Sequence, residues 1–138
     1  MKNNDTIKLE DFPFHHKMKP RWRDLDAFRH VNNATFLTYI EDARIILLKR
    51  WGVDYGSKSL IVAAVKIDYL KQVEHPSSLI IGQKVSRIGN KSFDIESAIF
   101  NGDDTEPSCI STVTSVAFNF ESSKTVKVYE EIIRDYNL

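Results

Sequence analysis

The chain has 138 residues, of which 42% are hydrophobic and 28% are charged, and its 19 basic residues balance its 19 acidic ones. This length fits one domain spanning residues 1–138 with a hydrophobic core of its own. A formal net charge of zero gives no indication of a nucleic-acid partner, which would favour a strongly basic surface.

The N-terminal residues and the single cysteine indicate the cellular compartment of the protein. Cys109 is the only cysteine, so no disulfide can form within the chain, and a lone thiol in a strand is usually an inert core residue. Residues 1–11 are polar, lack the apolar segment of a signal peptide and are expected to form a loose tail. No window approaches the about 18 consecutive apolar residues of a membrane span. The sequence therefore predicts a cytoplasmic protein without a membrane span.

Residues 12–22 begin the ordered part of the chain. They mix aromatic, basic and polar side chains and are predicted to form a first strand. Pro20 indicates an edge position or a bulge in that strand, because proline cannot donate a ladder hydrogen bond. Residues 24–30 are short, charged and irregular, which predicts a loop.

A long helix is predicted next, from about Asn33 to Trp51. Asn32 or Asn33 can cap its start, since asparagine side chains accept hydrogen bonds from free N–H groups there. Gly52 is the predicted stop signal of this helix. One apolar face repeats at helical spacing, and it consists of Phe36, Ile40, Ala43 and Leu47.

Four β segments separated by turn residues follow the helix. They cover residues 60–73, 79–88, 92–100 and 109–120. Such short connections make neighbouring strands antiparallel, and residues 129–136 are predicted to form a last short helix. The order of one strand, one long helix and four strands predicts an α+β fold in which an antiparallel five-stranded sheet wraps around the helix.

One stretch of the sequence carries a family resemblance. It reads Asp24-Leu25-Asp26-Ala27-Phe28-Arg29-His30-Val31-Asn32-Asn33 and is followed by Tyr39 and by Glu41-Asp42-Ala43-Arg44. This pattern resembles the 4-hydroxybenzoyl-CoA thioesterase branch of the hotdog superfamily, which typically carries an Asp, then His-Val-Asn-Asn, then Tyr and Glu-x-Ala-Arg on the central helix. The resemblance spans residues 14–130.

The resemblance implies a hotdog fold and an enzyme that hydrolyses an acyl-CoA to the free acid and CoA. It also implies a homodimer or homotetramer, joined through sheet edges, with the active sites at the interface. No cofactor and no metal ion are predicted. His15, His16 and His75 lack the supporting Cys, Asp or Glu pattern of a metal site, and there is no glycine-rich nucleotide loop.

Thioester hydrolysis requires an attacking group and stabilisation of the carbonyl oxygen as it gains negative charge. Asp26 is the predicted general base or nucleophile. The free N–H groups at the helix N-terminus are the predicted oxyanion site, and the resemblance places the donor amide at Asn33. The residues alone favour Asp26 as a helix cap, whereas the resemblance favours the catalytic role. Asp24, the competing carboxylate, is expected to face solvent or to pair with Arg23.

His30 and Arg29 each have two interpretations. His30 either orients the loop or binds the thioester oxygen, and a lone histidine more often has a structural role. Arg29 occupies a position that is commonly glycine in the family, so its side chain either alters access to the site or holds a carboxylate or phosphate.

The turn between the third and fourth strands is the predicted contact for CoA. It contains Arg87, Asn90, Lys91 and Ser92, at the position the family uses for pantetheine and phosphate. A solvated hairpin turn is the equally good alternative. On the helix, Glu41 and Arg44 are predicted to form an ion pair, and Phe36 and Tyr39 are predicted to be core residues.

Two other function classes remain open from the sequence. A hotdog dehydratase would usually carry an Asp-x-Asn-Pro-x-His pattern, but here His30 follows Asp26 by four positions with no Asn-Pro between them. A non-catalytic acyl-CoA binding module would have the same sequence features as the enzyme, so a hydrolysis assay distinguishes these two.

Overall fold

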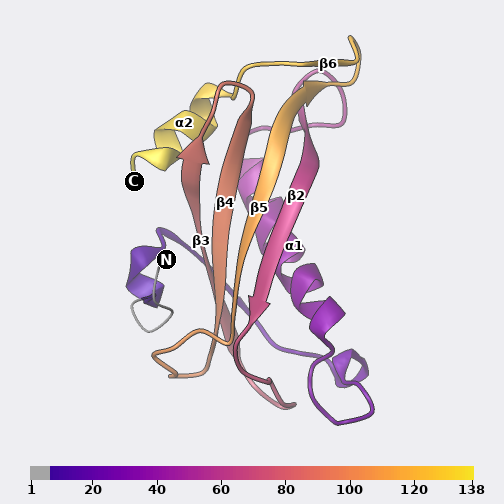
Figure 1. The fold of residues 1–138 in the computed structure, drawn as a ribbon, viewed down its shortest axis with the longest axis vertical. Coiled ribbons are helices and arrows are strands. Elements are labelled where there is room, and N and C mark those ends of the chain that lie inside the picture. The colour runs from indigo at the N-terminus through magenta and orange to yellow at the C-terminus, as the bar shows by residue number, and fades with distance from the viewer. Residues whose placement is uncertain (1–6) are drawn as a thin grey trace.

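A computed structural model describes residues 7–138, and its main feature is an antiparallel sheet with a long helix along one face (Figure 1). The strand order is β1-β3-β4-β5-β2, and the short β6 pairs with β5. The strands are β1 (Phe14–Met18), β2 (Ser59–Tyr69), β3 (Leu79–Ile88), β4 (Ser92–Asn101), β5 (Cys109–Asn119) and β6 (Lys124–Thr125). The helices are α1 (Asn33–Arg50) and α2 (Glu130–Tyr136), with 3-10 turns η2 (Leu9–Asp11) and η3 (Trp22–Asp24). The predicted α+β fold is confirmed.

Two predicted strands are shorter than expected. The first strand ends at Met18, and Trp22 belongs to η3. β2 ends at Tyr69 because the next two backbone N–H groups both turn to the carbonyl of Ser108. The chain then meets the loop before α1, where the N–H of Val31 donates to the carbonyl of Val73 at 2.7 Å.

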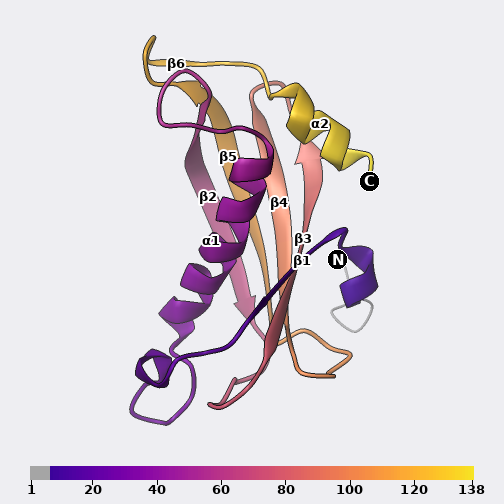
Figure 2. The same cartoon turned by 180° about the vertical axis from the view of Figure 1, so that it is seen from behind.

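The core lies between α1 and the inner face of the sheet (Figure 2). The buried face of α1 contains the four residues predicted from helical spacing together with Tyr39. Strand alternation places Cys109 and Val113 of β5 in the same core, so the predicted buried thiol is confirmed. Burial raises the pKa of Cys109 to about 12. Ile45 and Ile46, which lie outside this buried face of α1, remain 40% and 49% exposed.

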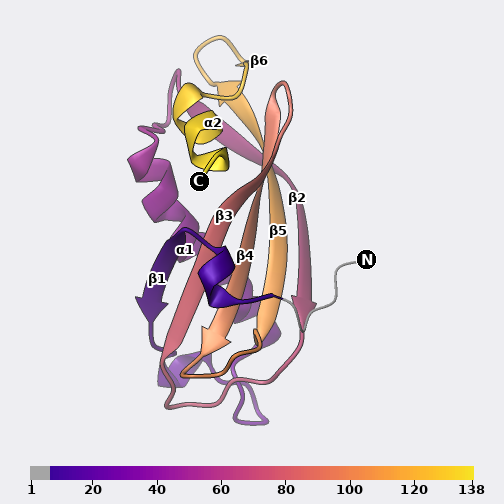
Figure 3. The ribbon, with the colours of Figure 1, turned by 90° about the vertical axis from the view of Figure 1, so that its left-hand side faces the viewer.

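The outer face of the sheet is covered in part by the N-terminal segment (Figure 3). Ile7 and Phe12 are 3% and 2% exposed and pack against Ala98 and Phe100 of β4. The prediction of a loose tail is therefore wrong for residues 7–11, because apolar side chains of this segment pack on the outer face of the sheet. Residues 1–6 of that predicted tail lie outside the described residues.

The C-terminal helix is joined to the end of α1 by a buried carboxylate. Asp135 of α2 accepts two hydrogen bonds from the guanidinium of Arg50, at 2.8 and 2.9 Å, and one from the indole N–H of Trp51 at 2.6 Å. The hydrogen bonds from Arg50 hold the pKa of Asp135 below its usual value. None of the helices within residues 7–138 is long and apolar enough to cross a membrane.

Candidate active site

Residues 24–32 form a closed loop at the N-terminal end of α1, at the bottom of Figure 1. The N–H of Asn32 donates to the carbonyl of Asp24, and the N–H of Asp26 donates to the carbonyl of His30, both at 2.9 Å. Leu25 and Val31 form an antiparallel bridge between these contacts. The two arms of the loop are thus held together like a short hairpin.

Asp26 lies inside this loop, half-buried. Its Oδ1 accepts a hydrogen bond from the N–H of Phe28 at 2.8 Å and a longer one from the N–H of His30 at 3.5 Å. The cap of α1 is Asn32, whose Oδ1 accepts from the N–H of Ala34 at 3.0 Å. Asp26 therefore shapes its own loop and does not cap the helix.

Asp24 lies deeper than expected. It is 5% exposed, and Tyr39 donates a hydrogen bond of 2.6 Å to its Oδ2. Arg21 contributes its backbone N–H at 2.8 Å and its guanidinium Nη2 at 3.1 Å. The prediction that Asp24 faces solvent or pairs with Arg23 is wrong, since a tyrosine fifteen positions later supplies a buried donor. Burial alone would raise the pKa of Asp24, but the hydrogen bonds from Tyr39 and Arg21 outweigh it and lower that pKa.

Asn33 is the first residue of α1, so its N–H precedes the intrahelical hydrogen bonds and belongs to the free donors of the helix end. Its carbonyl accepts a hydrogen bond of 2.8 Å from the hydroxyl of Tyr69, at the end of β2. Tyr69 is not among the site residues that the sequence predicts. Strand alternation puts it on the inner face, and only the folded chain shows that this position reaches the start of α1.

His30 contacts a neighbouring loop. Its backbone forms an antiparallel bridge with Glu74, and its Nε2 lies 3.7 Å from Oε1 of that residue. Its Nδ1 is buried and has no hydrogen-bond partner within the described chain. Arg29 is exposed and adopts a φ of 65°, in the left-handed region that favours glycine. This conformation explains physically why glycine suits the position.

The predicted CoA turn lies at the other end of the protomer. It joins β3 to β4 near the C-terminal end of α1, and a helix of 18 residues is about 27 Å long. Arg87 donates to the carboxylate of Asp94 at 2.9 and 3.1 Å and to Oγ of Ser92 at 3.0 Å. Lys91 is exposed and has no ion pair among residues 7–138. Within one chain, this turn therefore does not reach Asp26.

The expectations for the middle of α1 are met in part. Phe36 and Tyr39 are core residues, 1% and 2% exposed, as predicted. The predicted ion pair of Glu41 and Arg44 is wrong, because no contact within 4.0 Å joins them in the part of the chain that the structure describes. Burial lowers the pKa of Arg44, and the nearby charge of Glu41 opposes that effect.

Comparison with known proteins places this geometry in a family. The sequence matches the thioesterase-like superfamily over residues 20–135. The chain belongs to this superfamily. It is 32% identical over 124 residues to the uncharacterized protein YsmA of Bacillus subtilis (strain 168), covering 87% of this chain and 82% of that protein.

Two solved structures support the membership of the thioesterase-like superfamily. The PA5185 protein from Pseudomonas aeruginosa strain PAO1 is 27% identical, with a TM-score of 0.85 and coverage of 94% of this chain and 93% of that one. A thioesterase from Thermus thermophilus, in complex with coenzyme A and Zn, is also 27% identical, with a TM-score of 0.77 and coverage of 92% and 99%. The predicted hotdog thioesterase family is confirmed.

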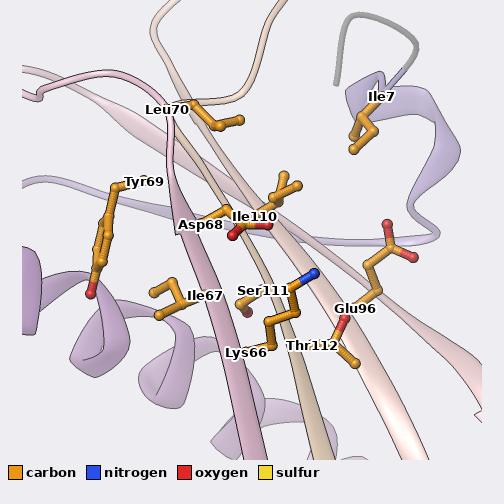
Figure 4. Close-up of a pocket in the computed structure, with 10 residues that line it drawn as sticks. All are labelled: Ile7, Lys66, Ile67, Asp68, Tyr69, Leu70, Glu96, Ile110, Ser111 and Thr112. Atoms are coloured by element: carbon orange, nitrogen blue, oxygen red, sulfur yellow. The ribbon is translucent and has the colours of Figure 1, made fainter. Parts of the chain in front are cut away.

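This superfamily member also has an open groove of about 700 Å³ on the outer face of the sheet (Figure 4). Lys66 and Asp68 of β2 line it opposite Ile110 and Thr112 of β5, with Ile7 at one side. None of the predicted site residues borders this groove. Within residues 7–138, no group of three or more His, Cys, Asp or Glu side chains is arranged to hold a metal ion.

Proposed function

We propose that the chain is an acyl-CoA thioesterase that hydrolyses an acyl thioester to the free acid and CoA. The observation that carries this proposal is the half-buried carboxylate of Asp26 in a closed loop that leads directly into the N-terminus of α1. Membership of the thioesterase-like superfamily supports it. The thioesterase from Thermus thermophilus, similar over most of its length, was solved with coenzyme A bound.

The reaction needs one free carboxylate oxygen, and Asp26 offers it. Both hydrogen bonds that the described chain donates to Asp26 go to Oδ1, which leaves Oδ2 for the substrate side. As a general base, Oδ2 takes a proton from water while the water oxygen bonds to the carbonyl carbon. The carbon–sulfur bond then breaks, and the CoA thiolate leaves and takes up a proton. As a nucleophile, Oδ2 bonds to the carbonyl carbon, the carbon–sulfur bond breaks, and the CoA thiolate leaves and takes up a proton. Water then hydrolyses the resulting acyl anhydride to the same products.

The carbonyl oxygen of the substrate gains negative charge during either route. We place it against the N–H of Asn33, because free donors at a helix N-terminus favour an anion. His30 orients the loop in this scheme, through its backbone N–H to Asp26 and its contact with Glu74. Arg29, exposed beside Asp26 along the chain, is placed at the entrance to hold a phosphate or carboxylate.

The working form in this proposal is a homodimer, or a homotetramer of two such dimers, joined through β2. That strand is at the free edge of the sheet and carries apolar side chains that are 40–44% exposed, namely Ile61, Val62, Val65 and Tyr69. Unpaired strand edges bind other strands readily. A two-fold axis perpendicular to the strands makes the two β2 strands antiparallel, so the Tyr69 end of one protomer meets the Ser59 end of its partner.

This arrangement accounts for the separation seen in one protomer. The β3–β4 turn lies at the same end of the sheet as Ser59, whereas Asp26 lies at the end of Tyr69. Antiparallel pairing brings the turn of one protomer to the same end of the dimer as the Asp26 loop of the other. Lys91 and Asn90 are then available to CoA, while Arg87 and Ser92 brace the turn through Asp94.

Release of free thiol from a panel of short, long and aromatic acyl-CoAs tests the proposal. We expect the native protein to hydrolyse at least one of them and Asp26→Asn to lose about 100-fold or more in kcat. Asp42→Asn, on the exposed face of α1, is the matched control and should keep native activity. Binding without hydrolysis across the panel would identify an acyl-CoA binding module instead. Full activity of Asp26→Asn would exclude Asp26 as the working carboxylate.

A further inference from the structure

The buried carboxylate of Asp24 has no part in the proposed chemistry, yet it is among the most strongly bound groups near the site. It accepts from the hydroxyl of Tyr39 at 2.6 Å and from the N–H and guanidinium of Arg21 at 2.8 and 3.1 Å. Hydrogen bonds to an ionised acceptor are about twice as strong as neutral ones. Such a cluster resists separation of the segments that it joins.

The segments joined are η3, the Asp26 loop and the second turn of α1. The carbonyl of Asp24 accepts from the N–H of Asn32, which is the helix cap, so the first contact of the loop starts at Asp24 itself. The side chain of Asp24 is held by Tyr39, six residues into the helix. The loop is therefore fixed to α1 at two places, through the chain at Asn32 and through the hydroxyl of Tyr39.

We propose that Asp24 and Tyr39 are a positioning pair that fixes the carboxylate of Asp26 relative to the N-terminus of α1. This inference rests on the proposed function of Asp26. Asp26 follows Asp24 by two residues, and its own N–H closes the second contact of the loop with His30. A movement of Asp24 is thereby passed to Asp26. A displacement of about 1 Å at a reacting group lowers a rate by up to about 100-fold.

Both members of the pair keep their hydrogen-bonding states near neutral pH. Burial and the carboxylate of Asp24 raise the pKa of Tyr39, so its hydroxyl stays protonated as the donor. The hydrogen bonds from Tyr39 and Arg21 lower the pKa of Asp24 despite its burial, so it stays ionised as the acceptor. The pair is thus a constant support, and its loss should lower kcat at every pH at which the enzyme is active.

Tyr39→Phe tests the inference, because it removes the hydroxyl and leaves the ring in the core. Its matched control is Tyr129→Phe, which removes a hydroxyl bonded at 2.7 Å to the carbonyl of Ser59, at the opposite end of β2 from the Asp26 loop of the same chain. We expect Tyr39→Phe to lower kcat by about 10- to 100-fold with KM little changed, and Tyr129→Phe to keep native kcat. The double variant Asp24→Asn/Tyr39→Phe should lose less than the two single losses combined, because both changes weaken the contact between these two side chains.

Amide hydrogen exchange supplies a readout that does not depend on activity. Residues 25–31 should exchange faster in Tyr39→Phe and in Asp24→Asn than in the native protein, and at the native rate in Tyr129→Phe. Native kcat together with native exchange in Tyr39→Phe and Asp24→Asn would overturn the positioning pair. If the native protein hydrolyses no acyl-CoA, the proposed function fails. Unchanged amide exchange in Tyr39→Phe and Asp24→Asn would separately show that Asp24 and Tyr39 do not hold the loop in place.

Discussion

The hydroxyl of Tyr69 donates a hydrogen bond of 2.8 Å to the carbonyl of Asn33, and so ties the end of the edge strand β2 to the first residue of α1. The ring of Tyr69 also lies 5.7 Å from the ring of Phe36, between centroids, on the first turn of the helix. The proposed dimer edge and the proposed oxyanion site are therefore in direct contact. A substitution at the proposed dimer edge is therefore expected to alter the geometry of the proposed oxyanion site.

Removal of this hydroxyl should weaken catalysis without unfolding the protein. In Tyr69→Phe the peptide of Asn33 loses the contact that orients it, and we expect kcat to fall by about 10-fold. Tyr55→Phe is the control, because Tyr55 is fully exposed. Steady-state hydrolysis of the best acyl-CoA of the panel measures both. Native kcat in Tyr69→Phe would show that Asn33 needs no support from β2.

A charge on the free edge of β2 should prevent dimer formation. Val65 is 42% exposed on the inner face of this strand, and in the proposed dimer it faces the partner. Val65→Lys places an ammonium group there, so we expect a monomer with a loss of hydrolysis. Ile46→Lys, at a 49% exposed position on α1, is the control and should stay dimeric. Sedimentation velocity distinguishes the species, and a native-sized Val65→Lys would contradict the proposed interface.

Substitutions at Phe12 and Gly82 should have non-additive effects on the free energy of unfolding, because these residues are in close contact. A Cβ at position 82 would lie 2.8 Å from the ring of Phe12, so Gly82→Ala should destabilise the fold by about 1–3 kcal/mol. Phe12→Ala should cost about 3–5 kcal/mol. In the Phe12→Ala background, Gly82→Ala should cost less than in the native protein, because the clash with the ring has gone and only the Cβ at position 12, 2.9 Å away, remains to shift. Urea unfolding at one protein concentration measures the cycle, and additive losses would contradict it.

Asp135 should make the stability of the fold depend on pH in the acidic range. Its pKa is lowered in the folded state, chiefly by the hydrogen bonds from Arg50, so its contribution is present above the unfolded value near 4 and is lost as the pH falls through the folded value. We expect Asp135→Asn to lower Tm by about 5 °C at pH 7 and this difference in Tm to shrink as the pH falls below the unfolded value near 4. Thermal unfolding across this range tests it. A constant difference in Tm at all pH values would be inconsistent with this titration.

Local patterns in the sequence predict the elements well where their causes are local. Helical spacing and an Asn cap place α1 within one residue of its observed bounds, and β3 has the bounds that the turn residues predict. The error at the end of β2 has a different origin. The two backbone N–H groups after Tyr69 donate to the carbonyl of Ser108, which lies almost forty residues later in the chain. No local sequence pattern contains this contact.

In the candidate site, too, features with local causes are predicted from the sequence and features that depend on distant residues are not. The loop, its carboxylate Asp26 and the cap Asn32 follow from residue types and from the resemblance. The burial of Asp24 does not, because it depends on Tyr39 reaching back from the second turn of α1. The distance between the β3–β4 turn and Asp26 is also a property of the folded protomer, since the motif says nothing about which end of a strand faces the loop.

The free edge of β2 has a consequence for the newly made chain. Its first seven residues, Ser59–Val65, carry no charge, and only Lys66 and Asp68 interrupt the apolar run with charged side chains. As long as this edge is unpaired, the strand can pair with other extended segments, and charged residues of this kind act as gatekeepers against such aggregation. The two charged side chains that oppose such pairing, Lys66 and Asp68, both face the outer groove, away from the core.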